Sequence, residues 1–205
     1  MTARPPAYRV AKRALDLVLT ALALVVLAPL LALVALAVWL EEPGAPVLFR
    51  QRRCGLGGRS FDLLKFRTMV PGADLLKDAL RERSVVAWPD FRLPGDPRVT
   101  RVGRVLRRTS LDELPQLVNV LRGDMSLVGP RPTSFDASTY ALWQTARLDF
   151  RPGITGPWQV HGRDRMDFAE RCRLEISFFR RASLARELWL LVETVGCVVK
   201  RTGVA

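Results

Sequence analysis

Histidine and cysteine, which often serve as metal ligands or catalytic groups, are scarce in this chain. The 205 residues include one histidine, His161, and three cysteines. A Ser-His-Asp triad or a His-rich metal site would have to rest on His161 alone. Cys54, Cys172 and Cys197 form no CxxC pair and lie near no histidine cluster. The sequence therefore argues against a zinc site and a disulfide framework, and favours reduced thiols in a cytosolic domain.

Acidic side chains are also in short supply. There are 20 Asp and Glu residues against 32 Lys and Arg, and the formal net charge is +12. Such a balance implies an anionic partner, which is nucleic acid, a phospholipid surface or a phosphorylated substrate. The chain is long enough for one domain with a sizeable core and a membrane element.

Charge is missing altogether between Leu17 and Leu40, where only Thr20 is polar. At about 1.5 Å per residue this segment makes about 36 Å of helix, enough to cross a hydrocarbon core of about 30 Å. Pro29 removes one backbone donor and favours a kink. Basic residues flank both ends, which suits a helix that bends and leaves the bilayer by the face it entered. These residues alone leave a spanning and a re-entrant helix as alternatives.

The remaining sequence predicts a mixed α/β fold that is rich in helix. Two short strands are expected around a glycine-rich turn, at 47–51 and 60–66. Helices are expected from apolar spacing at 73–83, 111–121, 167–179 and 183–200. The last of these is either a core helix or an interfacial helix on the bilayer. Loops are expected at 88–98, 129–132 and 151–162.

Two adjacent carboxylates, Asp112 and Glu113, stand out in this basic chain. One interpretation is structural, because Ser110 and Glu113 have the spacing of a capping box. Pro115 argues against a helix that begins at Ser110, since an amide donor would be needed at the proline. A helix with Asp112 as its N-cap avoids this problem and places the carboxylate at the positive end of the helix dipole.

The other interpretation is chemical. Arg104, Arg107 and Arg108 precede the two acids, and Arg131 follows them. Nearby positive charge lowers the pKa of a carboxyl group, so we expect Asp112 to stay ionised and able to attack phosphorus or bind Mg²⁺. Prolines on both sides of Arg131 stiffen the backbone, which suits a guanidinium fork that holds phosphate.

Six motifs, taken in order, resemble the bacterial sugar transferases, the monotopic phosphoglycosyl transferases. They run from about Lys12 to Lys200 and read KRALDLVLT, PGAPVLFRQRRCG, KFRTM, DPRVTRVGRVLRRTSLDELPQL, NVLRGDMSLVGPRP and RPGITGPWQVHGR. The resemblance implies transfer of a sugar-1-phosphate from a nucleotide diphosphate sugar, expected to be a UDP-sugar, to polyprenyl phosphate. Nucleoside monophosphate would be released, and the reaction would be the first membrane step of surface glycan synthesis.

The same resemblance assigns roles to residues of this chain. It implies that Asp112 is the nucleophile that forms a phosphosugar-aspartyl intermediate. It implies Mg²⁺ at Asp112 and Glu113, with Glu113 as a ligand or as a helper of the second step. Arg107 and Arg131 match positions that hold phosphate. The nucleotide region would comprise Pro152, Gly153, Gly156, Gln159 and Arg163.

The resemblance also decides the course of the N-terminal segment. It implies a re-entrant membrane helix over residues 1–42 that breaks at Ala28 and Pro29. Residues 43–205 would form a cytosolic catalytic domain with interfacial helices, at the cytoplasmic face of the bacterial inner membrane. The expected partners are the membrane, a nucleotide sugar and polyprenyl phosphate, and a homodimer is considered. This chain has Ala28 where a serine usually precedes the proline, and Leu174-Glu175 where Leu-Asp is usual.

A membrane-tethered protein that binds nucleic acid or anionic lipid without catalysis is the main alternative, because the charge of +12 permits it. The pairing of acids with arginines in one motif argues against nucleic acid as a partner, since DNA-contact surfaces avoid carboxylates. A non-catalytic membrane scaffold is the third reading. It would have no need for Asp112, Glu113 and Arg131 together.

Overall fold

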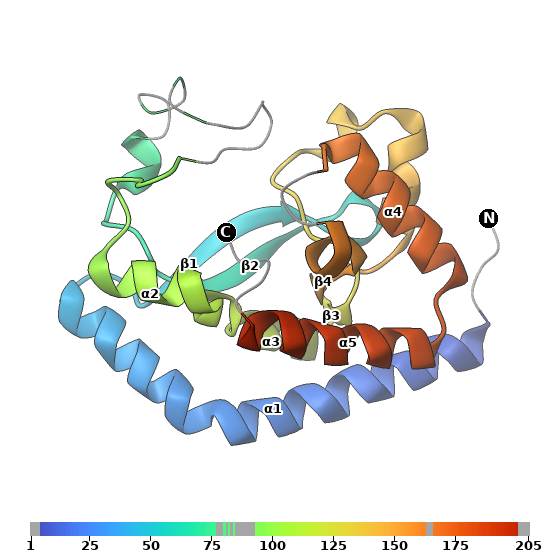
Figure 1. Ribbon diagram of the computed structural model, residues 1–205, viewed down its shortest axis with the longest axis horizontal. Helices are drawn as coiled ribbons and strands as arrows, with labels where there is room; N and C mark the ends of the chain where they lie inside the picture. The colour runs from blue at the N-terminus through green and yellow to red at the C-terminus, as the bar shows by residue number, and fades with distance from the viewer. Residues whose placement is uncertain are drawn as a thin grey trace.

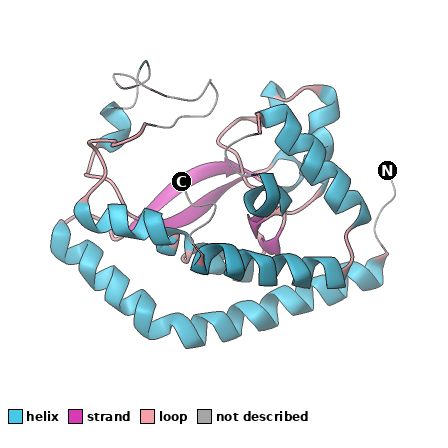
Figure 2. Cartoon of the chain, in the orientation of Figure 1, coloured by secondary structure: helices cyan, strands magenta, loops and turns pink. Residues whose placement is uncertain are grey.

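The computed structural model describes residues 5–76, 80, 82, 84, 93–162 and 166–200. Its helices and strands, in chain order, are α1 (Pro6–Glu41), β1 (Leu48–Cys54), η1 (Leu56–Gly58), β2 (Ser60–Phe66), η2 (Ala73–Leu76), α2 (Arg101–Thr109), η4 (Leu111–Glu113), α3 (Gln116–Arg122), β3 (Ser126–Val128), η5 (Ala137–Thr139), η6 (Leu142–Asp149), β4 (Gly153–Thr155), η7 (Trp158–Gly162), α4 (Phe168–Arg181) and α5 (Leu184–Val199). Figure 2 shows the strands at the centre, with helices below them and on both sides. The predicted α/β, helix-rich class is confirmed.

The N-terminal apolar segment forms one helix, α1, of 36 residues, with Pro29 inside it. Figure 1 shows α1 as a bowed helix whose concave side faces the other elements. On that side, Leu24 and Leu27 pack against one core cluster, and Val34 and Val38 belong to another. Ala28 and Pro29 therefore lie inside a continuous helix rather than between two helices. The re-entrant course through a bilayer stays a prediction.

Both ends of α1 are tied to the same domain. Near its start, the buried Asp16 carboxylate accepts hydrogen bonds from Ser126 Oγ at 2.8 Å and from the Leu127 amide at 3.2 Å. Near its end, the Arg67 guanidinium donates to the Val38 carbonyl at 2.9 Å. These contacts hold both ends of the helix against one domain.

Two helices present exposed apolar rows. On α1 the exposed large apolar side chains are Val10, Leu17, Val18, Leu22, Val25, Val26, Leu33, Leu36, Trp39 and Leu40. On α5 they are Leu188, Trp189, Val192, Val195 and Val198. Leu190 of α5 is buried in the core, so α5 is a core helix on one side and an apolar surface on the other. Exposed apolar patches of this extent mark contacts with a membrane or another protein.

The first sheet is the predicted hairpin, in which β1 pairs antiparallel with β2 and Phe49 lies opposite Lys65. The second sheet, β3 with β4, is a short parallel pair. β4 lies in the region 151–162 that was predicted to be a loop, so that prediction is wrong there, and β3 lies just before the predicted loop at 129–132, where no strand was predicted. A Cβ atom at Gly153 would lie 2.0 Å from the Gly129 amide nitrogen. The absence of a side chain at Gly153 therefore allows the β3 and β4 segments to approach closely enough to pair.

The helices predicted at 167–179 and 183–200 are confirmed as α4 and α5. The helix predicted at 73–83 begins instead with the 3₁₀ turn η2. Most of 77–83 and most of the loop predicted at 88–98 lie outside the described residues.

Candidate active site

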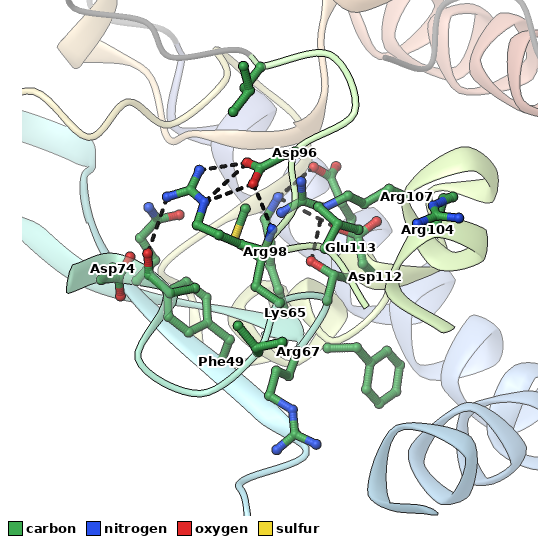
Figure 3. A pocket seen from close by; sticks show the side chains of 18 of the residues that line it. Phe49, Lys65, Arg67, Asp74, Asp96, Arg98, Arg104, Arg107, Asp112 and Glu113 are labelled. Atoms are coloured by element: carbon green, nitrogen blue, oxygen red, sulfur yellow. Dashed lines mark hydrogen bonds and ion pairs between the residues drawn. The ribbon is translucent and has the colours of Figure 1, made fainter. Parts of the chain in front are cut away.

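An open cavity of about 1580 Å³ lies between the β1–β2 hairpin, the segment before α2 and the turn η4. Its basic lining residues are Arg50, Arg53, Lys65, Arg67, Arg98, Arg104, Arg107, Arg108 and Arg131. Asp112 and Glu113 also line it. Figure 3 shows both acids close to Lys65. The structure thus brings the dyad and both proposed phosphate-binding arginines to one cavity.

The backbone before α3 sets the two acids side by side. Ser110 adopts a left-handed conformation, with φ of 57°, which ends α2 and starts the 3₁₀ turn η4. The α-helix itself begins at Gln116, with Pro115 as its N-cap. The prediction that Asp112 is the N-cap is therefore wrong, because the 3₁₀ turn comes first. Within the described residues the Ser110 side chain makes no cap hydrogen bond, so the capping-box interpretation is also wrong.

Glu113 binds two cations. Its Oε1 accepts hydrogen bonds from Lys65 Nζ at 2.9 Å and from Arg131 Nη2 at 2.7 Å, and its Oε2 accepts from Arg131 Nη1 at 3.3 Å. Burial alone would raise the pKa of Glu113, but Arg131 and Lys65 together hold this pKa well below its usual range. Glu113 therefore stays ionised and fixes both cations at the cavity wall.

Asp112 has a different environment. The residue is 8% exposed, and its Oδ2 lies 3.9 Å from Lys65 Nζ, an ion pair without a hydrogen bond. The pKa of Asp112 is raised overall, because burial raises it most and the neighbouring Glu113 raises it further, while Lys65, Arg107 and Arg131 lower it. The predicted net lowering of this pKa is therefore wrong: Arg107 and Arg131 do lower it, but burial and the charge of Glu113 outweigh them.

The two acids differ in how well they fit Mg²⁺, which prefers one or two carboxylates together with substrate phosphate oxygens. Both oxygens of Glu113 already accept hydrogen bonds from cations. Asp112 accepts none from the described residues, so its oxygens are available. In the described ranges no three His, Cys, Asp or Glu side chains group closely enough to hold a metal. An ion here would be bound jointly by Asp112 and the phosphates of a substrate.

The two arginines expected to hold phosphate are engaged differently. Arg107 uses Nε to donate to Thr68 Oγ1 at 3.0 Å, and burial lowers its pKa. No described residue bonds its terminal nitrogens, so they are available to an anion. Arg131 uses both terminal nitrogens on Glu113, and its side chain is 35% exposed. Arg131 can therefore contact a phosphate only alongside or in place of Glu113.

A buried ion pair behind the cavity holds the backbone of Arg131. Its amide donates to Glu175 Oε1 at 2.8 Å, and its carbonyl accepts from Arg147 Nη2 at 2.8 Å. Arg147 Nη2 also donates to Glu175 Oε2 at 2.6 Å. In the sequence, Glu175 stands out only as a departure from the family pattern, and Arg147 was not among the predicted site residues. An acid in the apolar run of α4 was the available signal, since a buried carboxylate needs a partner.

Lys65 and Asn119 were also missed. Asn119 is fully buried, its Oδ1 accepts from the Leu64 amide at 2.9 Å, and its Nδ2 donates to the Asp62 carbonyl at 2.8 Å. The side chain thus acts as an extra peptide group on the edge of β2. It fixes α3, and with it the preceding dyad, against the strand that carries Lys65. An amide among Leu117, Val118, Val120 and Leu121 was the available signal.

The residues that the resemblance assigns to nucleotide binding do not all line the cavity. Gln159 lines the cavity next to Trp158. Three others are not among its lining residues, namely Pro152, Gly153 and Gly156. The two glycines pack closely on Gly129, since a Cβ at Gly156 would lie 2.7 Å from the Gly129 carbonyl oxygen. Arg163 lies outside the described residues, and a nucleotide-binding role for this segment stays a prediction.

Comparison with known proteins agrees with the family that the motifs indicate. The family described as bacterial sugar transferase matches residues 7–201. The chain therefore belongs to the bacterial sugar transferase family, and the predicted resemblance is confirmed.

Several curated relatives match nearly the whole chain. A UDP-glucose:undecaprenyl-phosphate glucose-1-phosphate transferase of Caulobacter vibrioides is 47% identical, over 95% of this chain and 74% of its own length. The exopolysaccharide production protein ExoY of Sinorhizobium fredii is 38% identical, over 97% of this chain and 89% of its own. An undecaprenyl-phosphate galactose phosphotransferase of Salmonella typhimurium is 38% identical, over 95% of this chain but 42% of its own. The chain thus spans less than half the length of some relatives.

Proposed function

We propose that this protein transfers a sugar-1-phosphate from a nucleotide diphosphate sugar, expected to be a UDP-sugar, to polyprenyl phosphate through a covalent intermediate on Asp112. The main support for this proposal is the position of the Asp112 carboxyl group. It lies in the wall of a cavity lined by cations and accepts no hydrogen bond from the described residues. Two relatives bear names for this type of reaction, one with glucose and one with galactose. Their names support the substrate classes and leave the sugar open.

In the first half-reaction, an Asp112 oxygen attacks the phosphorus that carries the sugar. An Asp112–phosphorus bond forms, the bond from that phosphorus to the bridging oxygen breaks, and nucleoside monophosphate leaves with that oxygen. Arg107 is positioned to bind phosphate oxygens through its terminal nitrogens, to which no described residue is hydrogen-bonded. Bound Mg²⁺ would supply further neutralisation of phosphate charge. Burial of Asp112 suits this role, because a poorly solvated carboxylate is a stronger nucleophile once it is ionised.

In the second half-reaction, a phosphate oxygen of the lipid attacks the same phosphorus. A phosphorus–oxygen bond to the lipid phosphate forms, the bond to Asp112 breaks, and the free carboxylate returns. Glu113 holds Lys65 and Arg131 where they can neutralise the two phosphates. The ion pairs of Glu113 with Lys65 and Arg131 place positive charge beside Asp112, while Glu113 stays bonded to both cations.

A lipid acceptor requires contact with a bilayer, and the exposed apolar rows of α1 and α5 support it. We propose that α1 is re-entrant and dips into the cytoplasmic leaflet while both its ends stay on the domain's side. Anionic headgroups would add about 1 kcal/mol for each Lys or Arg near the surface. The excess of 32 basic over 20 acidic residues fits such a surface.

The test is release of nucleoside monophosphate by the purified protein from a panel of nucleotide sugars. We expect one donor to give about one equivalent per enzyme without lipid, and continued release once polyprenyl phosphate is added. Chelation of Mg²⁺ should abolish both. A non-catalytic lipid-binding protein would release none from any donor and still bind anionic vesicles.

A further inference from the structure

The active-site cavity contains an aromatic side chain beside its cations. Phe49 of β1 lines the cavity and is 37% exposed. In the hairpin it lies directly opposite Lys65, and directly opposed residues of an antiparallel pair project from the same face. Phe49 therefore lies next to the lysine that binds Glu113. Neither the proposed chemistry nor the hydrophobic core requires an aromatic ring there.

The same face of β1 changes from apolar to polar along the strand. Gln51 and Arg53 follow Phe49 at two-residue spacing, and both line the cavity. Arg53 donates to Gln51 Oε1 at 2.6 Å. In Figure 3, Phe49 lies below Lys65 and Asp96 lies above it. A cavity with an apolar end beside a cationic centre fits a phosphate that is attached to an apolar chain.

The apolar end of the cavity adjoins the last turns of α1. Arg67, just after β2, donates to the carbonyls of Val38 at 2.9 Å and Glu42 at 3.2 Å. Its guanidinium therefore joins this end of the hairpin to α1. Trp39, one residue beyond Val38, belongs to the exposed apolar row of α1. An isoprenoid chain that leaves the cavity past Phe49 would meet the surface proposed to lie in the bilayer.

We infer that Phe49 forms the subsite for the first isoprene units of the lipid acceptor, so that the lipid phosphate approaches Asp112 from the α1 end of the cavity. This inference rests on the proposed function. To that function it adds the path by which the lipid acceptor enters the cavity and one residue that contacts the acceptor. Because Phe49 contacts the lipid and not the nucleotide sugar, its removal affects only the second half-reaction.

The experiment separates the two half-reactions in the Phe49→Ala protein. The burst of nucleoside monophosphate without lipid should match that of the wild type. The kcat/KM for polyprenyl phosphate should fall about tenfold, which corresponds to about 1.4 kcal/mol of lost contact. Phe49→Leu, which keeps an apolar side chain, should recover most of the transfer. Leu56→Ala is the matched control, since Leu56 is 42% exposed in the same hairpin but does not line the cavity.

Three results would overturn the subsite. Unchanged kcat/KM for the lipid in Phe49→Ala would do so while leaving the proposed function intact. Equal losses of burst and transfer would do so as well, because Phe49 would then serve folding or the donor. Absence of any burst from the wild-type protein would remove the proposed function and the subsite together.

Discussion

Replacing Glu113 by glutamine tests whether the second acid of the dyad holds catalytic cations. Its two carboxylate oxygens accept three hydrogen bonds from Lys65 and Arg131. Glutamine keeps the size but offers one acceptor oxygen, and its amide nitrogen would face a donor nitrogen of Arg131. The substitution also removes the countercharge of both cations, which then compete for Asp112.

The magnitude follows from the bonds that lose their charge. Hydrogen bonds to charged groups contribute about 1.5–3 kcal/mol and neutral ones about 0.5–1.5 kcal/mol. The two short bonds, from Lys65 at 2.9 Å and Arg131 at 2.7 Å, would together lose about 2–3 kcal/mol. We take about 2 kcal/mol, because the Arg131 side chain is 35% exposed and solvent screens it. If the cations act in the transition state, kcat falls about 30-fold.

The assay is steady-state release of nucleoside monophosphate at saturating donor and lipid, with thermal unfolding measured alongside. Glu170→Gln is the matched control, because Asp167 and Glu170 form a genuine capping box on α4, where glutamine serves equally well. We expect Glu170→Gln to be silent in both measurements. A Glu113→Gln protein with kcat within twofold of the wild type would refute the reasoning.

Two further predictions concern the membrane helix and the scaffold of the dyad. With the native cysteines replaced, Ala7→Cys and Leu56→Cys should be labelled from the same face of sealed vesicles, since both ends of α1 contact one domain; labelling from opposite faces would establish a spanning helix. Asn119→Ala leaves the Leu64 amide and the Asp62 carbonyl unpaired, each at about 1–3 kcal/mol. Denaturant titration should show the free energy of unfolding lowered by about 2–6 kcal/mol, and an unchanged value would exclude the bridging role of Asn119.

Sequence reasoning succeeded where the pattern is local. Residues close together in the chain determine three parts of the fold. These are the apolar helix α1, the hairpin around its glycine-rich turn, and the two amphipathic helices α4 and α5. The prediction failed at Ser110. The sequence there matches a capping box, but Ser110 has a left-handed backbone conformation and a 3₁₀ turn follows it. The short β3–β4 pair escaped notice because strands of three residues carry too little alternation to detect.

The site could be predicted in its residues but not in its geometry. The dyad and its arginines lie within motifs, whereas Lys65 stands 48 residues before Glu113 and meets it only in the folded chain. The ion pair of Arg147 with Glu175 likewise joins residues 28 apart. The raised pKa of Asp112 comes first from burial, which a list of neighbouring charges does not reveal.

The claim that Asp112 carries the phosphosugar is tested most directly by mass spectrometry of the protein after incubation with its nucleotide sugar in the absence of lipid. We predict a mass gain of one phosphosugar per chain, located on a peptide that contains Asp112 and removed when polyprenyl phosphate is added. Asp112→Asn keeps the size of the side chain and should fold and bind membranes normally, yet show neither the adduct nor turnover. An Asp112→Asn protein that still turns over, or an adduct on a peptide without Asp112, would contradict the mechanism.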